Sequence, residues 1–119
     1  MEGPVEIAYY YKIRWGAARE FKDLFVKNHL PVLLAQQKTG RFLDIRMYEP
    51  KFHGEGHADW HFMTVLTFAN WAAVGASVDE DALARKIFAD LETHQREERR
   101  RFELMDAHWD VVLKPVPLS

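Results

Sequence analysis

Residues 42–68, FLDIRMYEPKFHGEGHADWHFMTVLTF, decide the fold of this chain. Apolar and polar residues alternate over 42–49, and an alternating pattern rich in aromatic residues, Val and Thr returns over 60–68, which is typical of β-strands. Pro50 ends the first strand, and the glycine-containing segment after it carries no helical pattern. The two strands are therefore predicted to follow each other as a hairpin, with no helix between them.

The residues before this hairpin predict a strand followed by a helix. Alternation over 5–15 includes three consecutive tyrosines, which favour an extended chain. Residues 17–38 then switch to helical spacing, and Gly40 is well placed to end the helix. Pro31 lies inside this pattern and is expected to kink or split the helix near His29.

The residues after the hairpin predict a second helix and a last strand. Ser77 and Glu80 have the spacing of a capping box at the start of a long helix over 79–105. Carboxylates near its start and arginines near its end complement the helix dipole. Residues 108–114 predict a strand, which Pro115 ends.

This order, β-α-β-β-α-β, predicts a ferredoxin-like α+β fold in a single domain over 1–119. The four strands are expected to form one antiparallel sheet with both helices on one face. In this topology the first strand is central, the third and last strands flank it, and the second strand lies beyond the third.

Composition narrows the possible functions. The chain has 119 residues, a net charge of -2 and 48% hydrophobic residues, so we expect neither a nucleic-acid partner nor a membrane span. It has no cysteine, which leaves no disulfide, thiolate nucleophile or Cys-ligated zinc. The N-terminus lacks the features of a signal peptide. We expect a cytoplasmic protein, although a chain whose export signal had been removed would look the same.

The alternation divides the strand residues between the two faces of the sheet. The set expected to pack on the helices is Ile7, Tyr9, Tyr11, Ile13, Leu43, Ile45, Met47, Met63, Val65, Val111 and Leu113. The opposite set is Tyr10, Lys12, Arg14, Phe42, Asp44, Arg46, Tyr48, Trp60, Phe62, Thr64, Leu66, Phe68, His108 and Asp110. The aromatic residues of this set would expose a larger apolar area than the surface of an ordinary monomer does. We therefore expect a second copy of the chain to cover this face.

The chain resembles the dimeric α/β-barrel superfamily. The resemblance is carried by the element order, by the aromatic strand over 5–15, and by the strand over 60–68 that leads into Asn70-Trp71-Ala72-Ala73. It places the chain near the antibiotic-biosynthesis monooxygenase-like and stress-response barrel proteins, and it implies fold and dimerisation rather than a particular activity. Haem-degrading members use an Asn, a Trp and a His. Here Asn70 and Trp71 are adjacent and His29 lies on the first helix, which departs from that pattern, so we predict no cofactor.

The segment 53–61 holds three histidines, His53, His57 and His61. Their spacing of four would align them on a helix, as in many metal sites, but the glycines and the flanking strands favour a loop. Three interpretations stay open: a solvated hairpin loop, a His-ligated metal site, and a loop whose His57 or His61 lines the mouth of a pocket. We favour no metal.

The charged and aromatic residues of the second face suggest a function. We expect a homodimer that binds a small, partly aromatic organic molecule between sheet and helices, and the residues expected to contact it are Tyr10, Arg14, Asp44, Tyr48, Trp60 and His57. The alternative from the enzyme class is a cofactor-independent monooxygenase or isomerase of a phenolic or polyketide-like substrate. There, His108 or His61 would be the general base, and Arg46 or Arg14 would stabilise an oxyanion. Ion pairs that tie a dimer together would explain the same charges.

Overall fold

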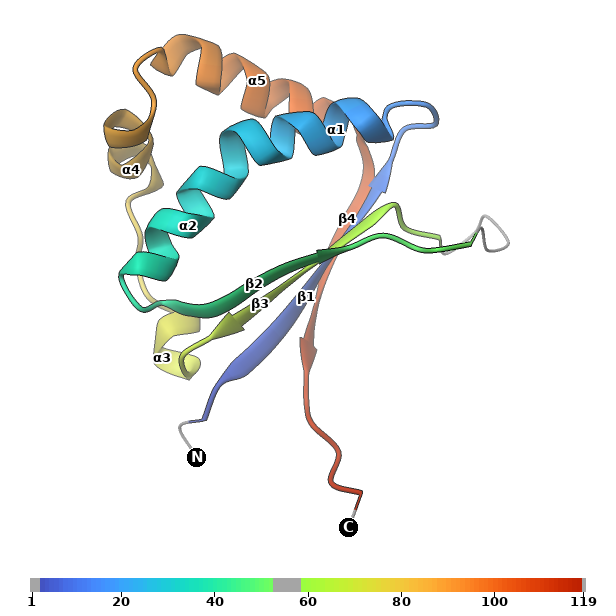
Figure 1. The fold of residues 1–119 in the computed structure, drawn as a ribbon, viewed down its shortest axis with the longest axis vertical. Coiled ribbons are helices and arrows are strands. Elements are labelled where there is room, and N and C mark those ends of the chain that lie inside the picture. Colours follow the sequence, from blue (N-terminus) through green and yellow to red (C-terminus); the bar gives the residue numbers. More distant parts are fainter. Residues whose placement is uncertain (1–2, 53–58, 119) are drawn as a thin grey trace.

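The computed structural model describes residues 3–52 and 59–118, which form a four-stranded sheet with helices on one side (Figure 1). The elements are β1 (Val5–Ile13), α1 (Ala18–Leu24), the π-helical segment η1 (Phe25–His29), α2 (Leu30–Lys38), β2 (Phe42–Tyr48), β3 (Phe62–Phe68), α3 (Trp71–Val74), α4 (Glu80–Ile87), α5 (Leu91–Glu103) and β4 (Met105–Leu113). The strands pair in the order β2-β3-β1-β4, and every pair is antiparallel. The predicted ferredoxin-like topology is therefore confirmed.

The first helix changes its winding before Pro31, as the sequence predicts. Pro31 has no N–H, and its ring would clash with the carbonyl four residues earlier in a regular α-helix. The chain forms a π-helical turn here, in which the Leu30 N–H donates to the carbonyl of Phe25. The helix continues as α2 with Pro31 in its first turn. His29 is the last residue of the π turn, a type of irregularity that is frequent at functional sites.

The prediction of one continuous second helix over 79–105 is wrong. It is two helices, α4 and α5, because Phe88 takes an extended conformation and Asp90 starts a new helix by accepting from the Thr93 N–H at 3.0 Å. Phe88 then stacks on His94 with ring centroids 3.9 Å apart. The cap of α4 is Asp79, whose side chain accepts from Ala82, rather than the predicted Ser77.

The core lies between the sheet and α1, η1 and α2. Phe21 is fully buried and stacks on Phe62, and its ring also lies close to Tyr11 of the central strand. The residues of the core cluster are Val5, Ile7, Tyr11, Ile13, Phe21, Phe25, Leu33, Phe42, Phe62, Leu66, Phe68 and Leu104. These helices therefore cover β1, β3 and β2, while β4 stays largely exposed.

The predicted division of residues between the two faces is wrong for β3. Pairing with β1 places Phe62 opposite Tyr11 and Thr64 opposite Tyr9, so residues 62, 64, 66 and 68 face the helices. Phe62, Thr64, Leu66 and Phe68 are indeed buried. Both alternate sets of this strand are mostly apolar, so its own pattern could not show which set faces inward.

A bulge explains the error on β2, and the pairing with β1 shows the error on β4. On β2 the register shifts between Phe42 and Asp44, so Phe42 is buried and Leu43 is exposed, the reverse of the prediction. On β4 the register shifts beside Lys12 of β1, and His108 and Asp110 pair with Tyr11 and Tyr9. These two residues therefore lie on the side of the helices. Val111 and Leu113 lie on the outer face instead.

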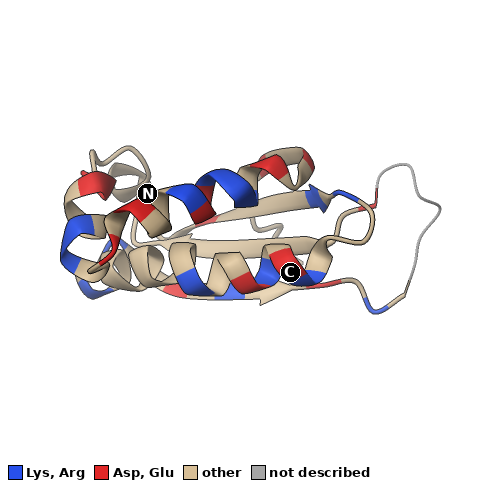
Figure 2. Ribbon diagram, turned by 90° about the horizontal axis from the view of Figure 1, so that it is seen from above, with Lys and Arg blue, Asp and Glu red and all other residues tan. Residues whose placement is uncertain are grey.

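Charged residues of both signs are interspersed along the helices (Figure 2). This agrees with the small net charge of -2 and leaves no extended stripe of one sign on the helices. None of the helices in residues 3–52 and 59–118 combines the length and the apolar character needed to cross a membrane.

Candidate functional site

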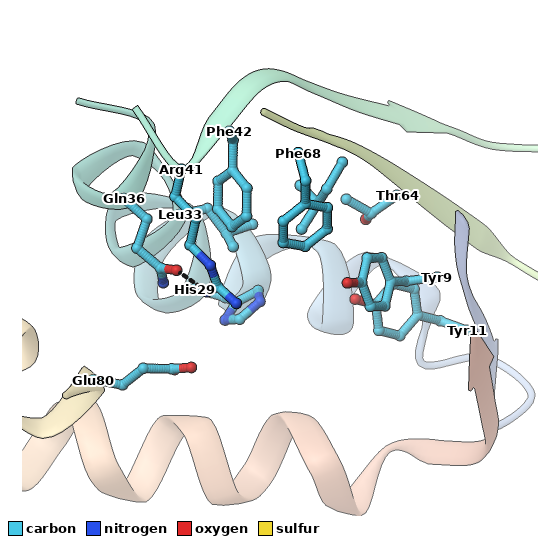
Figure 3. A pocket seen from close by; sticks show the side chains of 11 residues that line it. Tyr9, Tyr11, His29, Leu33, Gln36, Arg41, Phe42, Thr64, Phe68 and Glu80 are labelled. Carbon is cyan, nitrogen blue, oxygen red and sulfur yellow. Dashed lines mark hydrogen bonds between the residues drawn. The ribbon is translucent and has the colours of Figure 1, made fainter. Parts of the chain in front are cut away.

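A cavity of about 230 Å³ lies between the inner face of the sheet and α2. Figure 3 shows side chains from β1, β2, β3, η1 and α2 converging on it, with Glu80 at its edge. Its lining residues are Tyr9, Tyr11, His29, Leu33, Gln36, Arg41, Phe42, Thr64, Leu66, Phe68 and Glu80. Aromatic and aliphatic walls combined with a few polar groups are the usual composition of a small-molecule site.

His29 reaches this cavity from the end of the π turn. Its ring lies edge-on to Phe25 with centroids 5.1 Å apart, and its Nδ1 is 3.9 Å from an oxygen of Glu98. Burial, assisted by the nearby cation of Arg101, lowers the pKa of His29 from 6.5 to about 4. The imidazole is therefore uncharged at neutral pH and can both accept and donate a hydrogen bond.

Two tyrosines of β1 line the cavity from the side of the sheet. Burial, together with the carboxylate of Asp110, raises the pKa of Tyr9 to about 12, against an opposing effect of the Arg41 cation. Burial also raises the pKa of Tyr11, while Arg101 and the hydroxyl of Thr64 act in the opposite direction. Both phenols are protonated at neutral pH and are available as donors.

Thr64 is the least expected member of the site. Thr64 is 2% exposed, and its Oγ1 makes no hydrogen bond of ideal geometry within the described part of the chain; its neighbour is the Tyr11 hydroxyl, whose pKa it lowers through a distorted hydrogen bond. Tyr9 lies directly opposite on β1, and Figure 3 shows the hydroxyl of Thr64 on the side of the tyrosines. A buried hydroxyl without a partner costs on the order of 1–3 kcal/mol. The Tyr11 hydroxyl meets this need only in part, so a ligand group in the cavity could complete the hydrogen bonding of Thr64.

The sequence-predicted site residues do not form one cluster. On the outer face, Tyr10 stacks on Trp109 and meets Trp60 edge-on, with centroids 5.3 and 5.5 Å apart. Asp44 and Arg46 form an exposed ion pair further along the same face. The side chains of Tyr48 and Asp44 raise the pKa of Arg46 by forming hydrogen bonds with its cation, so these three predicted residues do lie together.

The predicted catalytic residues lie apart from one another. His108 is on the inner face, stacks on Tyr11 with centroids 4.6 Å apart, and bonds through Nδ1 to the carbonyl of Tyr10. Its Nε2 is 3.7 Å from Asp110. His61 accepts through Nδ1 from the Ile13 N–H, which leaves that nitrogen without a free lone pair. His108 and Arg46 therefore lie on opposite faces of the sheet and do not meet.

The remaining predicted residues lie at the end of the sheet. Arg14 is exposed and donates to the carbonyl of Glu103, and His53 and His57 lie outside the described residues. Trp60 and His61 border a larger hollow of about 770 Å³. Its walls include Trp15 and Phe52, which are 87% and 78% exposed, so much of its lining is in contact with solvent. Across residues 3–52 and 59–118, no group of three or more His, Asp or Glu side chains could hold a metal.

Sequence reasoning missed most of the interior site. Only His29 carried a signal, because it lies next to Pro31, where a helical irregularity is expected. Thr64 was assigned to the opposite face, and Gln36 and Arg41 are separated by a helix end that no pattern connects to a cavity. The arrangement offers uncharged donors and acceptors among aromatic walls, which suits a small ring with one or two polar groups.

Comparison with known proteins places this fold among ferredoxin-like structures. No family model and no curated protein matches the sequence. A hypothetical protein of Arabidopsis thaliana, solved in solution, is 16% identical, with 100% of this chain and 96% of that chain covered and a TM-score of 0.62. A dimeric ferredoxin-like protein of unknown function from Jannaschia sp. CCS1 is 14% identical, with 95% and 100% covered and a TM-score of 0.57.

A third similar structure has the same fold. A Caulobacter crescentus CB15 protein, provisionally assigned as an antibiotic biosynthesis monooxygenase, is 14% identical, with 98% and 92% covered and a TM-score of 0.54. Identities this low establish the fold and leave activity open. At the level of the fold, the chain is therefore a ferredoxin-like α+β protein.

Proposed function

We propose that this protein binds a small, partly aromatic organic molecule in the cavity between its sheet and α2. The observation that carries the proposal is the buried Oγ1 of Thr64 at the wall of that cavity, which makes no hydrogen bond of ideal geometry and has only the Tyr11 hydroxyl as a distorted partner. Tyr9 and His29 line the same cavity, are uncharged at neutral pH and can share hydrogen bonds with a ligand.

The dimensions of the cavity limit the size of this ligand. Sites for drug-sized ligands occupy roughly 300–1,000 Å³. At about 230 Å³, the cavity is smaller than these, so we expect a molecule of one ring rather than a fused polyketide skeleton. Phe42 and Phe68 provide the aromatic wall against which such a ring would pack.

Titration with p-cresol tests the proposal. The probe should shift the NMR signals of methyl-labelled Thr64 and of the His29 ring, and it should leave Thr67 on the opposite face unchanged. Thr64→Val keeps the shape and removes the hydroxyl, so we expect about fivefold weaker binding from one lost hydrogen bond. Thr67→Val is the matched control and should bind as the wild type does. Equal shifts on both faces, or none at saturation, would contradict the proposal.

We further propose that the outer face of the sheet binds a second copy of the chain. This face presents the partly exposed apolar side chains of Tyr48, Trp109, Val111 and Leu113. The Jannaschia protein, which has the same fold, is dimeric. Homodimers are the commonest oligomers and would bury such a patch on both copies.

Sedimentation velocity tests the homodimer. Val111→Asp introduces a charge into the proposed interface and should yield monomers at concentrations where the wild type is a dimer. Val26→Asp is the matched control, since Val26 is similarly exposed, at 47% against 39%, but lies on η1. A wild-type protein that is monomeric at micromolar concentration would contradict the proposed homodimer.

A catalytic role for the same cavity is the second candidate function. It is favoured by the uncharged imidazole of His29 beside two phenol donors, which could take part in proton transfer in a cofactor-independent monooxygenase or isomerase. Oxygen uptake with one-ring phenols, in air, should then be lost in His29→Gln and kept in His108→Ala. The opposite result would return the catalytic role to His108, and turnover unchanged in both variants would exclude either histidine.

A further inference from the structure

Arg41 is a half-buried cation in the wall of the cavity. Its Nε donates to the carbonyl of Ala73 at 2.9 Å, its Nη2 to the carbonyl of Val74 at 3.1 Å, and its Nη1 to the side-chain oxygen of Gln36. All three acceptors are neutral. The rings of Phe42 and Phe68 lie 5.3 Å from the guanidinium carbon and also carry no formal charge.

Arg41 therefore has no counter-charge among residues 3–52 and 59–118. No carboxylate of the described chain forms an ion pair with it, whereas Arg101, Arg46 and Arg100 each have one. Of the five N–H groups of a guanidinium, three are used in the contacts named above, which leaves two for another acceptor. A partly buried cation without a counter-ion is costly, and the balance is restored when an anion binds.

The surroundings of Arg41 locate that anion. The Arg41 cation acts on the phenol of Tyr9, which places its charge close to the polar wall of the cavity. Figure 3 shows the guanidinium entering the cavity from the start of β2, on the side of Gln36, while the tyrosine hydroxyls enter from the opposite side. Glu80 also lines the cavity but is exposed and makes no ion pair with Arg41.

We infer that the ligand of this cavity is a small organic anion, a one-ring carboxylate whose acid group binds Arg41 while its ring packs on Phe42 and Phe68. This inference rests on the proposed function, since it names the chemical class of the molecule bound there. Arginine suits a carboxylate because its planar fork can donate two parallel hydrogen bonds.

A structural role for Arg41 is the competing explanation. Its bonds to Ala73 and Val74 hold the carbonyls at the end of α3, and a cation at a helix C-terminus is stabilising in its own right. That role requires the three observed hydrogen bonds but no anion in the cavity. The two explanations differ in whether the protein distinguishes a charged ligand from a neutral ligand of the same shape.

Benzoate and benzamide make this distinction. They share one ring and nearly one shape, and only benzoate is charged at neutral pH. With NMR of Thr64 and His29 as the readout, wild-type protein should bind benzoate about tenfold more tightly than benzamide, as expected for a charge-assisted hydrogen bond. Equal affinities would overturn the inference without any variant.

Two variants assign the preference to Arg41. Arg41→Lys and Arg41→Gln both lose the forked anchoring of α3, but only the lysine keeps the charge. We expect the preference for benzoate to survive in part in Arg41→Lys and to disappear in Arg41→Gln. A preference that both variants keep, or that both lose, would overturn the role of the Arg41 charge.

The failure of this inference is distinguishable from the failure of the proposed function. If p-cresol, benzamide and benzoate all leave the cavity signals unchanged, the cavity is not a binding site and the proposed function fails. If p-cresol and benzamide bind and benzoate gains nothing, the cavity binds neutral rings and only the anionic class is wrong.

Discussion

The two faces of the sheet are built from the same strands but differ in how their polar groups are buried and paired. On β3, Thr64 faces the helices with its hydroxyl buried and without a hydrogen bond of ideal geometry, while Thr67, three residues on, is half-exposed on the outer face. On the inner face, polar groups line a cavity that is open at one side, and Thr64 and Gln36 among them are buried. On the outer face, the charged pair Asp44–Arg46 is exposed and mutually satisfied.

This difference shows where function is to be sought on this chain. A polar group in water gains little from a partner, whereas a buried one is costly until a partner is found. The outer face is richer in obvious candidates, such as the Tyr10–Trp109 stack, but among the described residues it has no buried polar side chain without a hydrogen-bond partner. The inner face has two groups that a ligand could satisfy, Thr64 and Arg41.

Truncating the inner face should have the largest effect on stability. Phe21 is fully buried against Phe62 and Tyr11, so Phe21→Ala should lower the free energy of unfolding by about 4 kcal/mol. Val111→Ala on the outer face should cost less than about 1 kcal/mol when measured at low protein concentration. Urea denaturation checks both variants, and equal losses would contradict the contrast between the faces.

Breaking the ion pair of α5 should cause the second-largest loss of stability. Arg101 is 2% exposed and is held by Glu98 with contacts of 2.9 and 3.2 Å. Glu98→Gln removes the counter-charge and should cost about 3 kcal/mol in the same denaturation assay. Asp44→Asn, which breaks the exposed pair with Arg46, should cause no measurable change. A comparable loss in the two variants would mean that burial does not separate the two pairs.

The stability of the fold should depend on pH through His29. Its pKa is 6.5 when unfolded and about 4 in the fold, so below pH 6.5 the unfolded chain binds a proton that the native protein does not. Its contribution to stability is therefore present above pH 6.5 and is lost as the pH falls toward 4. We expect a loss of roughly 2 kcal/mol between pH 7 and pH 5, absent in His29→Gln. An unchanged pH dependence in this variant would contradict the burial of the imidazole.

The smallest expected effect compares the two threonines of β3. Without ligand, Thr64→Val removes a buried hydroxyl that lacks a hydrogen bond of ideal geometry and should raise the free energy of unfolding by about 1 kcal/mol. Thr67→Val, on the outer face, should change it by less than about 0.5 kcal/mol. If Thr64→Val is instead destabilising, its hydroxyl is already satisfied in the folded protein, and the main support for the proposed ligand is lost.

Much of the fold could be predicted because it depends on local patterns. The alternation over 5–15 and 42–49, the helical spacing over 17–38 and the absence of a helix between the two hairpin strands follow from interactions between near neighbours in the chain. Pro31 predicted an irregular helix for the same reason, since its missing N–H acts within one turn. Element order then leaves few topologies, and the observed strand order is the expected one.

The site depends on relations that no local pattern contains. Which alternate set of β3 faces the helices is decided by its pairing with β1, and the bulge beside Leu43 reverses the pattern at the start of β2. Arg41 meets the carbonyls of Ala73 and Val74 only after the sheet has formed. Periodicity reports how each segment alternates, whereas burial and unmet hydrogen bonds arise between segments, and so the fold could be inferred before the cavity could.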